Sequence, residues 1–279
     1  MHPAIAGGRV AVVTGAASGI GFAAARRFGE AGMRVVMADL DAEALAASAA
    51  ELARDGIAAR AVVTDVGDPE SVARLHAEAE QFGETALLMN NAGREGGGAI
   101  LAGAALWQQT IATNLMGAVY GLQTFLPRML SAEWPCAIVT TGSKQGITLP
   151  PGDTAYNVSK AGLRALTESL AHDLRATDGR VSAHLLIPGF TYTGFTRARG
   201  VTEKPAGAWT PEQVVDFMLK GMAAGDFYIL CPDNEVARDL DEKRIAWGAG
   251  DIIANRSALS RWDPHYAAAF KAHMEGKGA

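Results

Sequence analysis

Two residues four positions apart, Tyr156 and Lys160, carry side chains that together can move a proton. A turn rich in proline and glycine ends at Asp153 or Thr154, either of which is a natural N-cap, and the Ala- and Leu-rich run after it predicts a helix over residues 154–176. Residues four apart share one helix face, so the Lys160 ammonium reaches the space around the Tyr156 phenol. A phenol titrates near about 10, and a neighbouring cation lowers its pKa. The pair predicts a tyrosine general acid or base.

Ser143 supplies a hydroxyl that can hold a carbonyl or alcohol oxygen against this phenol. It stands thirteen positions before Tyr156, directly after the predicted strand 137–141, so a strand end and a helix start should bring the two together. A tyrosine and a lysine with this spacing also occur on ordinary helix surfaces, and the rest of the chain must decide between the two interpretations.

A glycine-rich loop follows the first predicted strand, residues 9–14, and precedes a predicted helix over 22–31. Such a loop lets backbone N–H groups and a helix N-terminus approach a pyrophosphate. Gly15 permits the tight turn, Gly19 the close approach, and Gly21 close packing of helix on strand. The spacing G-x-x-x-G-x-G differs from G-x-G-x-x-G, and an ordinary βα turn is the alternative, but the position after the first strand favours a dinucleotide loop.

Asp39 ends the next predicted strand, residues 33–38, eighteen positions past Gly21. An acidic residue there accepts hydrogen bonds from an adenosine ribose and repels a 2′-phosphate, so we expect NAD as cofactor and disfavour NADP. Arg34 does not oppose this, because at about 3.3 Å per residue it lies roughly 16 Å back down the strand. The alternative role for Asp39, an N-cap of the following helix, can be filled by Asp41.

Composition limits the remaining possibilities. With 279 residues, 49% hydrophobic and 20% charged, the chain can bury one large core, and we expect a single domain over 1–279. A net charge of −5 without any Lys/Arg block argues against nucleic acid. No apolar run approaches the about 20 residues of a membrane span, and no signal peptide is evident, so we expect a cytoplasmic protein. Cys136 and Cys231 should be free, buried thiols, and the scattered histidines predict no metal site.

Predicted strands and helices alternate along the chain, which predicts an α/β fold: a Rossmann-type doubly wound parallel sheet of about seven strands with helices on both faces. Besides the elements above, the predicted strands are 59–64, 86–89 and 181–187, and the predicted helices are 42–54, 69–82 and a paired region over 103–131. Parallel sheets bind ligands at the carboxyl ends of their strands. The polar and glycine clusters fall there.

These motifs, in their order and spacing over about residues 9–195, resemble the classical short-chain dehydrogenase/reductase (SDR) family. The matching residues are Thr14-Gly15-Ala-Ala-Ser-Gly19-Ile-Gly21, Asp65-Val66, Asn90-Asn-Ala-Gly93, Asn114, Ser143, Tyr156-x-x-x-Lys160 and Pro188-Gly189.

The resemblance implies roles for most of the matching positions. The implied catalytic residues are Asn114, Ser143, Tyr156 and Lys160. Cofactor contacts are implied for Gly15, Ser18, Gly19, Ile20, Gly21, Asp39, Leu40, Asp65, Val66, Asn91, Ala92, Gly93, Tyr156, Lys160, Pro188, Gly189, Thr191 and Thr193. Asn114 would hold a water beside Lys160 in a proton relay, or else serve as a hydrogen-bonding residue of its helix.

We therefore expect an NAD(H)-dependent oxidoreductase that transfers hydride between nicotinamide and a secondary alcohol or ketone. A catalytically silent NAD-binding sensor or scaffold is the alternative, although it need not retain all the catalytic residues. A nucleotide-sugar epimerase or dehydratase usually carries a larger C-terminal domain than the forty-five residues after Asn234. The resemblance also points to a homodimer or homotetramer through helices 103–131 and 154–176.

Substrate identity depends on loops, chiefly residues 190–210, a predicted substrate loop. The residues expected to line the pocket are Gln145, Phe190 and Tyr192. Phe195 and Trp209 favour a partly apolar substrate or else anchor the loop by packing. The charges of Arg94, Glu95 and Lys144 are expected to be solvated.

Residues 234–279 form a C-terminal extension that the family resemblance does not explain. Trp247, Trp262, Tyr266 and Phe270 would not stay exposed in a floppy tail, so the segment is expected to fold. It should pack on the substrate side or, alternatively, against a neighbouring subunit.

Overall fold

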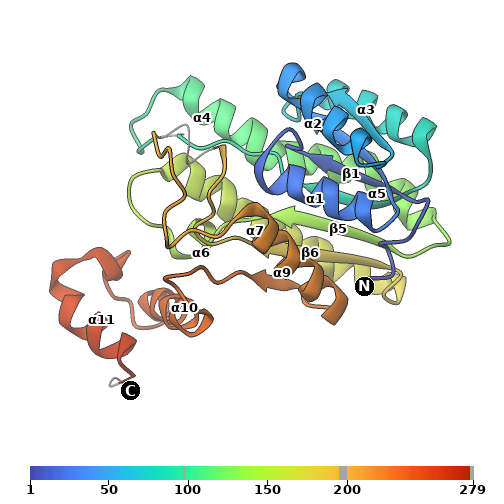
Figure 1. The fold of residues 1–279 in the computed structure, drawn as a ribbon. Helices are drawn as coiled ribbons and strands as arrows, with labels where there is room; N and C mark the ends of the chain where they lie inside the picture. Colours follow the sequence, from blue (N-terminus) through green and yellow to red (C-terminus); the bar gives the residue numbers. More distant parts are fainter. Residues whose placement is uncertain (97, 195–199, 277–279) are drawn as a thin grey trace.

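Seven parallel strands form the centre of the molecule in the computed structural model, which describes residues 1–96, 98–194 and 200–276 (Figure 1). Their order across the sheet is β3-β2-β1-β4-β5-β6-β7. The strands are β1 (Val10–Thr14), β2 (Arg34–Asp39), β3 (Ala59–Val63), β4 (Thr85–Asn90), β5 (Cys136–Thr141), β6 (Val181–Ile187) and β7 (Tyr228–Leu230). The chain reverses its direction of travel across the sheet between β1 and β4, and this reversal opens a crevice at their carboxyl ends.

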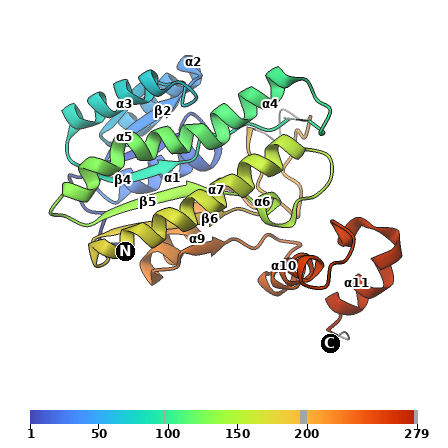
Figure 2. The ribbon, with the colours of Figure 1, turned by 180° about the vertical axis from the view of Figure 1, so that it is seen from behind.

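Helices cover both faces of the sheet, as Figures 1 and 2 show from opposite sides. Ala11 and Val13 of β1 pack with α1, α2 and α9, whereas Val10 and Val12 pack with α3, α5 and α7. Successive side chains of a strand point to opposite faces, so a strand buried on both sides must be apolar throughout. The predicted α/β fold, a doubly wound Rossmann-type sheet, is confirmed.

Local signals account for most helix bounds. The helices are α1 (Gly19–Glu30), α2 (Ala42–Arg54), α3 (Pro69–Phe82), α4 (Ala104–Ile111), α5 (Gly117–Ser131), α6 (Gln145–Thr148), α7 (Thr154–Asp173), α9 (Pro211–Ala224), α10 (Arg238–Ile253) and α11 (Ala267–Met274). Asp41 caps α2 and Asp68 caps α3, and both helices match their predicted bounds. The predicted helix 154–176 continues after α7 as a 3₁₀ turn over Leu174–Thr177.

The predicted helical region 103–131 is interrupted. A π-helical turn, Ala112–Met116, separates α4 from α5, and nothing in the hydrophobic pattern predicted it. The short helix α6 directly after Ser143 was also not predicted. Both irregular elements lie at the carboxyl edge of the sheet.

The C-terminal extension folds into helices and lies outside the sheet layers, beyond one end of them (Figure 1). Trp247 is only 6% exposed, and its indole nitrogen donates to the Ser260 hydroxyl at 2.8 Å. Its ring packs edge-on against Phe270 of α11 at 5.3 Å. Trp247 and Phe270 therefore hold the extension together from within, whereas Trp262 is 37% exposed, contrary to the expectation.

Other predictions concern single residue types. Cys136 and Cys231 are free and buried, as predicted. Among the described residues, no helix combines the length and apolar character needed to cross a membrane. The same residues contain no group of three side chains suited to hold a metal ion.

Two histidines connect the N-terminal segment to the amino end of β6. The Ala4 N–H donates to His2 Nδ1 (3.2 Å), so His2 carries its proton on Nε2, which faces the Ser182 hydroxyl at 3.2 Å. The Asp226 carbonyl can only accept, so His184 carries its proton on Nδ1 (2.7 Å), and its Nε2 accepts from Ser182 at 3.1 Å. This chain of hydrogen bonds requires both rings to be neutral.

This arrangement makes stability depend on pH. Burial and the neighbouring His184 ring lower the pKa of His2 to about 4, and burial lowers the pKa of His184. A histidine with a depressed folded pKa stabilises the fold above its unfolded value, about 6.5, and that stabilisation is lost as the pH falls toward the folded value. We expect Tm to drop as the pH falls from about 6.5 toward about 4, and His2→Gln to show a shallower drop by differential scanning fluorimetry.

His172→Gln is the matched control, because the His172 side chain is 72% exposed. It should keep the slope of the unmodified protein. An unchanged slope in His2→Gln would show that His2 does not carry the pH dependence.

Candidate active site

The glycine loop packs too closely on its surroundings to accept side chains. Gly15 has a φ of +66°, and a Cβ there would lie 2.8 Å from the Ala92 Cα. A Cβ on Gly21 would overlap the Gly15 carbonyl oxygen and lie 2.7 Å from Asn91 Nδ2. Ser18 is the N-cap of α1, yet its side chain makes no capping hydrogen bond within the described residues. The first N–H groups of α1 thus remain able to bind an anion such as a pyrophosphate.

Thr14 joins the ends of β1 and β4. Its hydroxyl oxygen accepts from the backbone N–H groups of Asn91 and Ala92, both at 3.0 Å. Asn91 Nδ2 in turn donates to the Thr14 carbonyl at 3.0 Å. Thr14 had no predicted role, although its place between a buried strand and Gly15 was the available signal. These bonds hold the carboxyl ends of β1 and β4 together.

Asp39 ends β2 beside the glycine loop, as predicted. One carboxylate oxygen accepts from the Ala17 N–H at 3.0 Å. The adjacent Leu40 is 68% exposed. Arg34 lies at the far end of β2 and donates to the Phe82 carbonyl at 2.8 Å, so it does not reach this position.

The next predicted cofactor residues lie after β3. Asp65 is exposed, and its carboxylate accepts from the Gly67 N–H at 2.9 Å. Val66 is buried, and a Cβ on Gly117 would lie 2.8 Å from its side chain. Ile20 of α1 packs against the core cluster on the α1 side of the sheet.

Tyr156 and Lys160 share one face of α7, which Asp153 caps by accepting from the Tyr156 N–H at 3.4 Å. Tyr156 is 8% exposed, and the Lys160 ammonium lies 5.6 Å from the centre of its ring. The ammonium donates to the Thr141 carbonyl at 2.8 Å. This bond ties α7 to the end of β5, two residues before Ser143.

Ser143 is held by the short helix α6. Its hydroxyl oxygen accepts from the Gln145 N–H at 3.1 Å, and its carbonyl accepts from the Gly146 N–H at 3.0 Å. A Cβ on Gly146 would lie 2.5 Å from the Lys160 carbonyl carbon, so α6 packs directly on α7. The structure thus brings Ser143, Tyr156 and Lys160 to one edge of the sheet.

Burial lowers the pKa of Lys160 to about 8, and the charge of Glu95 opposes that shift. A group with such a pKa remains about nine-tenths protonated at neutral pH. Lys160 is therefore a buried cation beside a phenol, the arrangement that favours the phenolate.

Asn114 lies in the π-helical turn and is 1% exposed. Its side-chain oxygen accepts from the Arg94 N–H at 2.7 Å, and its side-chain nitrogen donates to the Arg94 carbonyl at 2.9 Å and the Ser159 hydroxyl at 3.0 Å. A Cβ on Gly93 would lie 3.6 Å from the Asn114 side-chain oxygen and 3.7 Å from the Lys160 ammonium. Asn114 thus clamps the loop after β4 onto α7. The water relay stays a prediction.

The segment after β6 reaches the glycine loop. A Cβ on Gly19 would lie 3.4 Å from the Thr193 side chain. Thr191 pairs with Trp209 in a parallel bridge, and its hydroxyl donates to the Gly189 carbonyl at 3.2 Å. Phe190 is 44% exposed. The segment therefore crosses from β6 toward α1.

Two aromatic residues of the predicted substrate loop have structural contacts. The Tyr192 hydroxyl donates to the Thr202 carbonyl at 2.8 Å and so links two parts of the loop, while its place in the pocket lining stays a prediction. Trp209 packs against Phe217 of α9 at 5.8 Å, so it anchors the loop by packing. Phe195 lies outside the described residues.

Lys144 corrects another expectation. It is not a solvated loop charge: its side chain is 17% exposed, and its ammonium lies 2.6 Å from Asp241 in the C-terminal extension. Asp241 lies 97 positions further along the chain, and local sequence patterns do not reveal contacts between residues so far apart. The pairing was therefore not predicted.

A family model described as "short chain dehydrogenase" matches residues 9–204. The chain belongs to this family. The resemblance seen in the motifs is confirmed, and the glycine loop, Tyr156 and Lys160 all lie within the matched range.

Named relatives of this short-chain dehydrogenase support the assignment. It is 37% identical over 254 residues to 1-deoxy-11-beta-hydroxypentalenate dehydrogenase from Streptomyces exfoliatus, covering 86% of this chain and 88% of that protein. A short-chain dehydrogenase/reductase from Burkholderia phymatum, solved in complex with NAD, is 33% identical, covers 90% of this chain and 96% of its own, and superposes with a TM-score of 0.81.

A third relative carries the other cofactor. A variant of actinorhodin polyketide ketoreductase, solved with NADPH, is 27% identical, covers 79% of this chain and 94% of its own, and has a TM-score of 0.70. Structural neighbours of this short-chain dehydrogenase therefore include proteins that bind NAD and proteins that bind NADPH.

The close packing at Gly21 generates a stability prediction. Gly21→Ala should lower the free energy of unfolding in urea by about 1–3 kcal/mol, because the added methyl meets Gly15 and Asn91 in a hydrogen-bonded junction that cannot relax freely. Gly248→Ala in α10 is the control, since its methyl would meet no described atom within 4 Å. That variant should gain up to about 1 kcal/mol from helix propensity. Equal changes in the two variants would contradict the packing interpretation.

Proposed function

We propose that the chain is an NAD(H)-dependent oxidoreductase that transfers hydride between nicotinamide and a secondary alcohol or ketone. The observation that carries this proposal is the convergence of Ser143, Tyr156 and the buried cation Lys160 at the carboxyl edge of the sheet, beside the glycine loop. The Streptomyces relative is named as a dehydrogenase of a hydroxyl-bearing compound, which agrees with this class of reaction.

In the proposed mechanism, Tyr156 moves the proton at the substrate oxygen. Ser143 holds the same oxygen, because its own oxygen accepts from Gln145 and its proton remains able to donate. Lys160, cationic at neutral pH, favours the phenolate form of Tyr156. NAD, when bound, supplies the hydride chemistry.

The residues present fit a dinucleotide. The first N–H groups of α1 and the glycine loop would hold the pyrophosphate, and Asp39 would accept hydrogen bonds from the adenosine ribose. A 2′-phosphate would place a second negative charge beside this carboxylate, so we propose NAD in preference to NADP. Asp65, Val66, Thr191 and Thr193 are proposed as further contacts. The predicted substrate residues Gln145, Phe190 and Tyr192 remain proposed as pocket-lining.

A panel of secondary alcohols and ketones, followed by absorbance of the reduced nicotinamide, tests this function. We expect turnover with at least one member, and a kcat/KM higher with NAD than with NADP. Equal kcat/KM for the two cofactors would overturn the preference. Retained NAD binding without any turnover would favour a silent NAD-binding protein instead.

A double substitution tests the physical reason for the cofactor preference. Asp39→Ser with Leu40→Arg removes the repelling carboxylate and places a cation at an exposed position beside it. We expect this variant to shift its preference toward NADP.

Removing the Tyr156 hydroxyl tests the proton step. Tyr156→Phe keeps the shape of the side chain, so turnover should fall by a factor on the order of 10² or more while NAD binding, measured by calorimetry, is largely retained. Tyr120→Phe on α5 is the matched control and should keep its kcat. Near-normal kcat in Tyr156→Phe on a true substrate would mean that the mechanism is wrong.

We further propose a homodimer or homotetramer in the cytoplasm, assembled through α4, α5 and α7. Val158 of α7 is 46% exposed and Leu130 of α5 is 40% exposed. Large apolar side chains exposed on these helices support a subunit contact there.

A further inference from the structure

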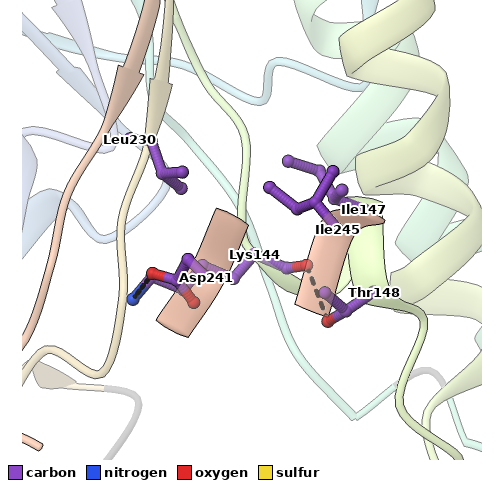
Figure 3. A pocket seen from close by; sticks show the side chains of 6 residues that line it. All are labelled: Lys144, Ile147, Thr148, Leu230, Asp241 and Ile245. Carbon is purple, nitrogen blue, oxygen red and sulfur yellow. Dashed lines mark hydrogen bonds and ion pairs between the residues drawn. The ribbon is translucent and has the colours of Figure 1, made fainter. Parts of the chain in front are cut away.

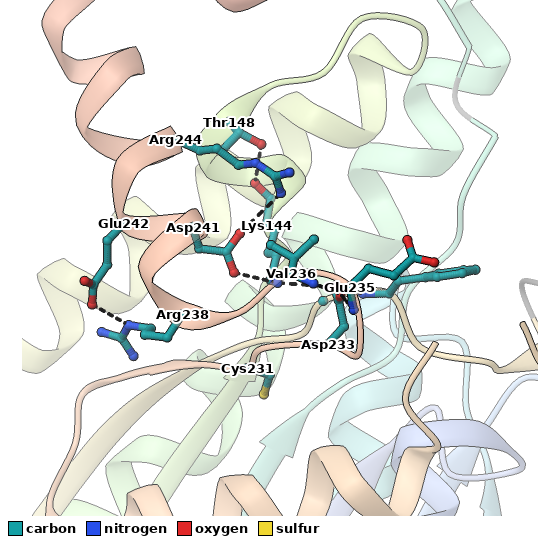
Figure 4. A network of polar contacts seen from close by, with 12 residues as sticks. Lys144, Thr148, Cys231, Asp233, Glu235, Val236, Arg238, Asp241, Glu242 and Arg244 are labelled. Carbon is teal, nitrogen blue, oxygen red and sulfur yellow. Dashed lines mark hydrogen bonds and ion pairs between the residues drawn. The ribbon is translucent and has the colours of Figure 1, made fainter. Parts of the chain in front are cut away.

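A buried cluster of charges joins the C-terminal extension to the residue after Ser143 (Figure 4). The Lys144 ammonium lies 2.6 Å from the Asp241 carboxylate and 3.3 Å from the Asp233 carboxylate. The side chains of Asp233 and Asp241 are only 6% and 5% exposed. Arg244 adds a second cation at 3.8 Å from Asp241. Buried charges are costly unless they are paired, so the cluster holds its segments in one arrangement.

Apolar contacts surround the same junction (Figure 3). Ile245 of α10 packs against Ile147 of α6 and against Leu230 at the end of β7. The residues that line the small pocket between them are Lys144, Ile147, Thr148, Leu230, Asp241 and Ile245. The extension thus docks on α6, the helix that holds Ser143.

The cluster also reaches the segment after β6. The Asp233 oxygen that faces Lys144 accepts from the Phe190 N–H at 3.2 Å. A Cβ on Gly189 would lie 2.6 Å from that oxygen and 2.8 Å from the Lys144 ammonium. The charges are therefore packed against the backbone of Gly189 and Phe190, in the segment after β6.

We propose that Lys144, Asp233 and Asp241 are positioning residues through which the C-terminal extension holds Ser143 and the Gly189–Phe190 backbone in their working places. This inference builds on the proposed dehydrogenase function and adds residues that do not touch the substrate. A serine that must hold the substrate oxygen tolerates little displacement, since a misplacement of about 1 Å can cost 10²-fold in rate.

Asp241→Asn tests the positioning role. It keeps the shape of the side chain and leaves Lys144 paired with Asp233. We expect kcat to fall about tenfold or more on an alcohol found in the panel, with the Kd for NAD within about twofold. Glu242→Gln is the control: the same charge is removed from the same helix, but this carboxylate is 59% exposed and, among the described residues, pairs with Arg238 alone. Its kcat should stay within about twofold. Normal kcat in Asp241→Asn would overturn the proposal.

The Ser143→Ala background shows whether the effect passes through Ser143. Once that hydroxyl is absent, Asp241→Asn should cause little further loss of kcat. If Asp241→Asn lowers kcat by the same factor in the Ser143→Ala background as in the unmodified protein, positioning through Ser143 is overturned.

Amide hydrogen exchange tests the same inference without activity. In Asp241→Asn, the amides of residues 142–147 and 188–190 should exchange several-fold faster than in Glu242→Gln. Asp233→Asn provides a second variant, in which the Phe190 amide should lose protection. If no alcohol in the panel is turned over, the proposed function fails while this measurement still decides the inference. Unchanged exchange in both aspartate variants would overturn it, whatever the activity.

Discussion

Burial of both sheet faces is the constraint on which the rest of this structure depends. Helices cover the sheet on each side, and an unpaired polar group inside those layers would lose its hydrogen bonds to water. Polar chemistry is therefore confined to the strand ends. Thr14 illustrates how such an end is used: its hydroxyl oxygen accepts from two backbone N–H groups directly after the neighbouring strand β4 and joins the two strand ends.

Burial of the Lys160 ammonium organises the other half of this edge. A cation without water needs protein oxygens and close packing, and the Thr141 carbonyl supplies one such oxygen. The loop carrying Gly93 approaches the same ammonium because Asn114 holds it from the π-helical turn. Such turns are frequent at functional sites, since they re-aim a side chain without ending the helix. The end of β5, the loop after β4 and the π-helical turn thus all shape the surroundings of the Lys160 ammonium.

The extension obeys the same constraint from outside the sheet. The chain continues past β7 at the carboxyl edge, so its next polar residues arrive beside the site rather than behind it. Asp233 and Asp241 pair there with the ammonium of Lys144, and Ile245 packs against the apolar cluster that contains Leu230. The end of the chain therefore packs beside the residues that follow β5 and β6.

The amino-acid sequence alone determined most strands and helices up to β6 and the order of the principal motifs. Strand and helix periodicity, caps such as Asp41 and Asp68, and the spacing of Tyr156 and Lys160 are local properties, so they can be recognised without the fold. Only the tertiary structure decided the π-helical turn and the partner of Lys144. Those features arise where segments distant in sequence pack together, and the cost of burying a charge selects its partner only after the fold has placed both groups side by side.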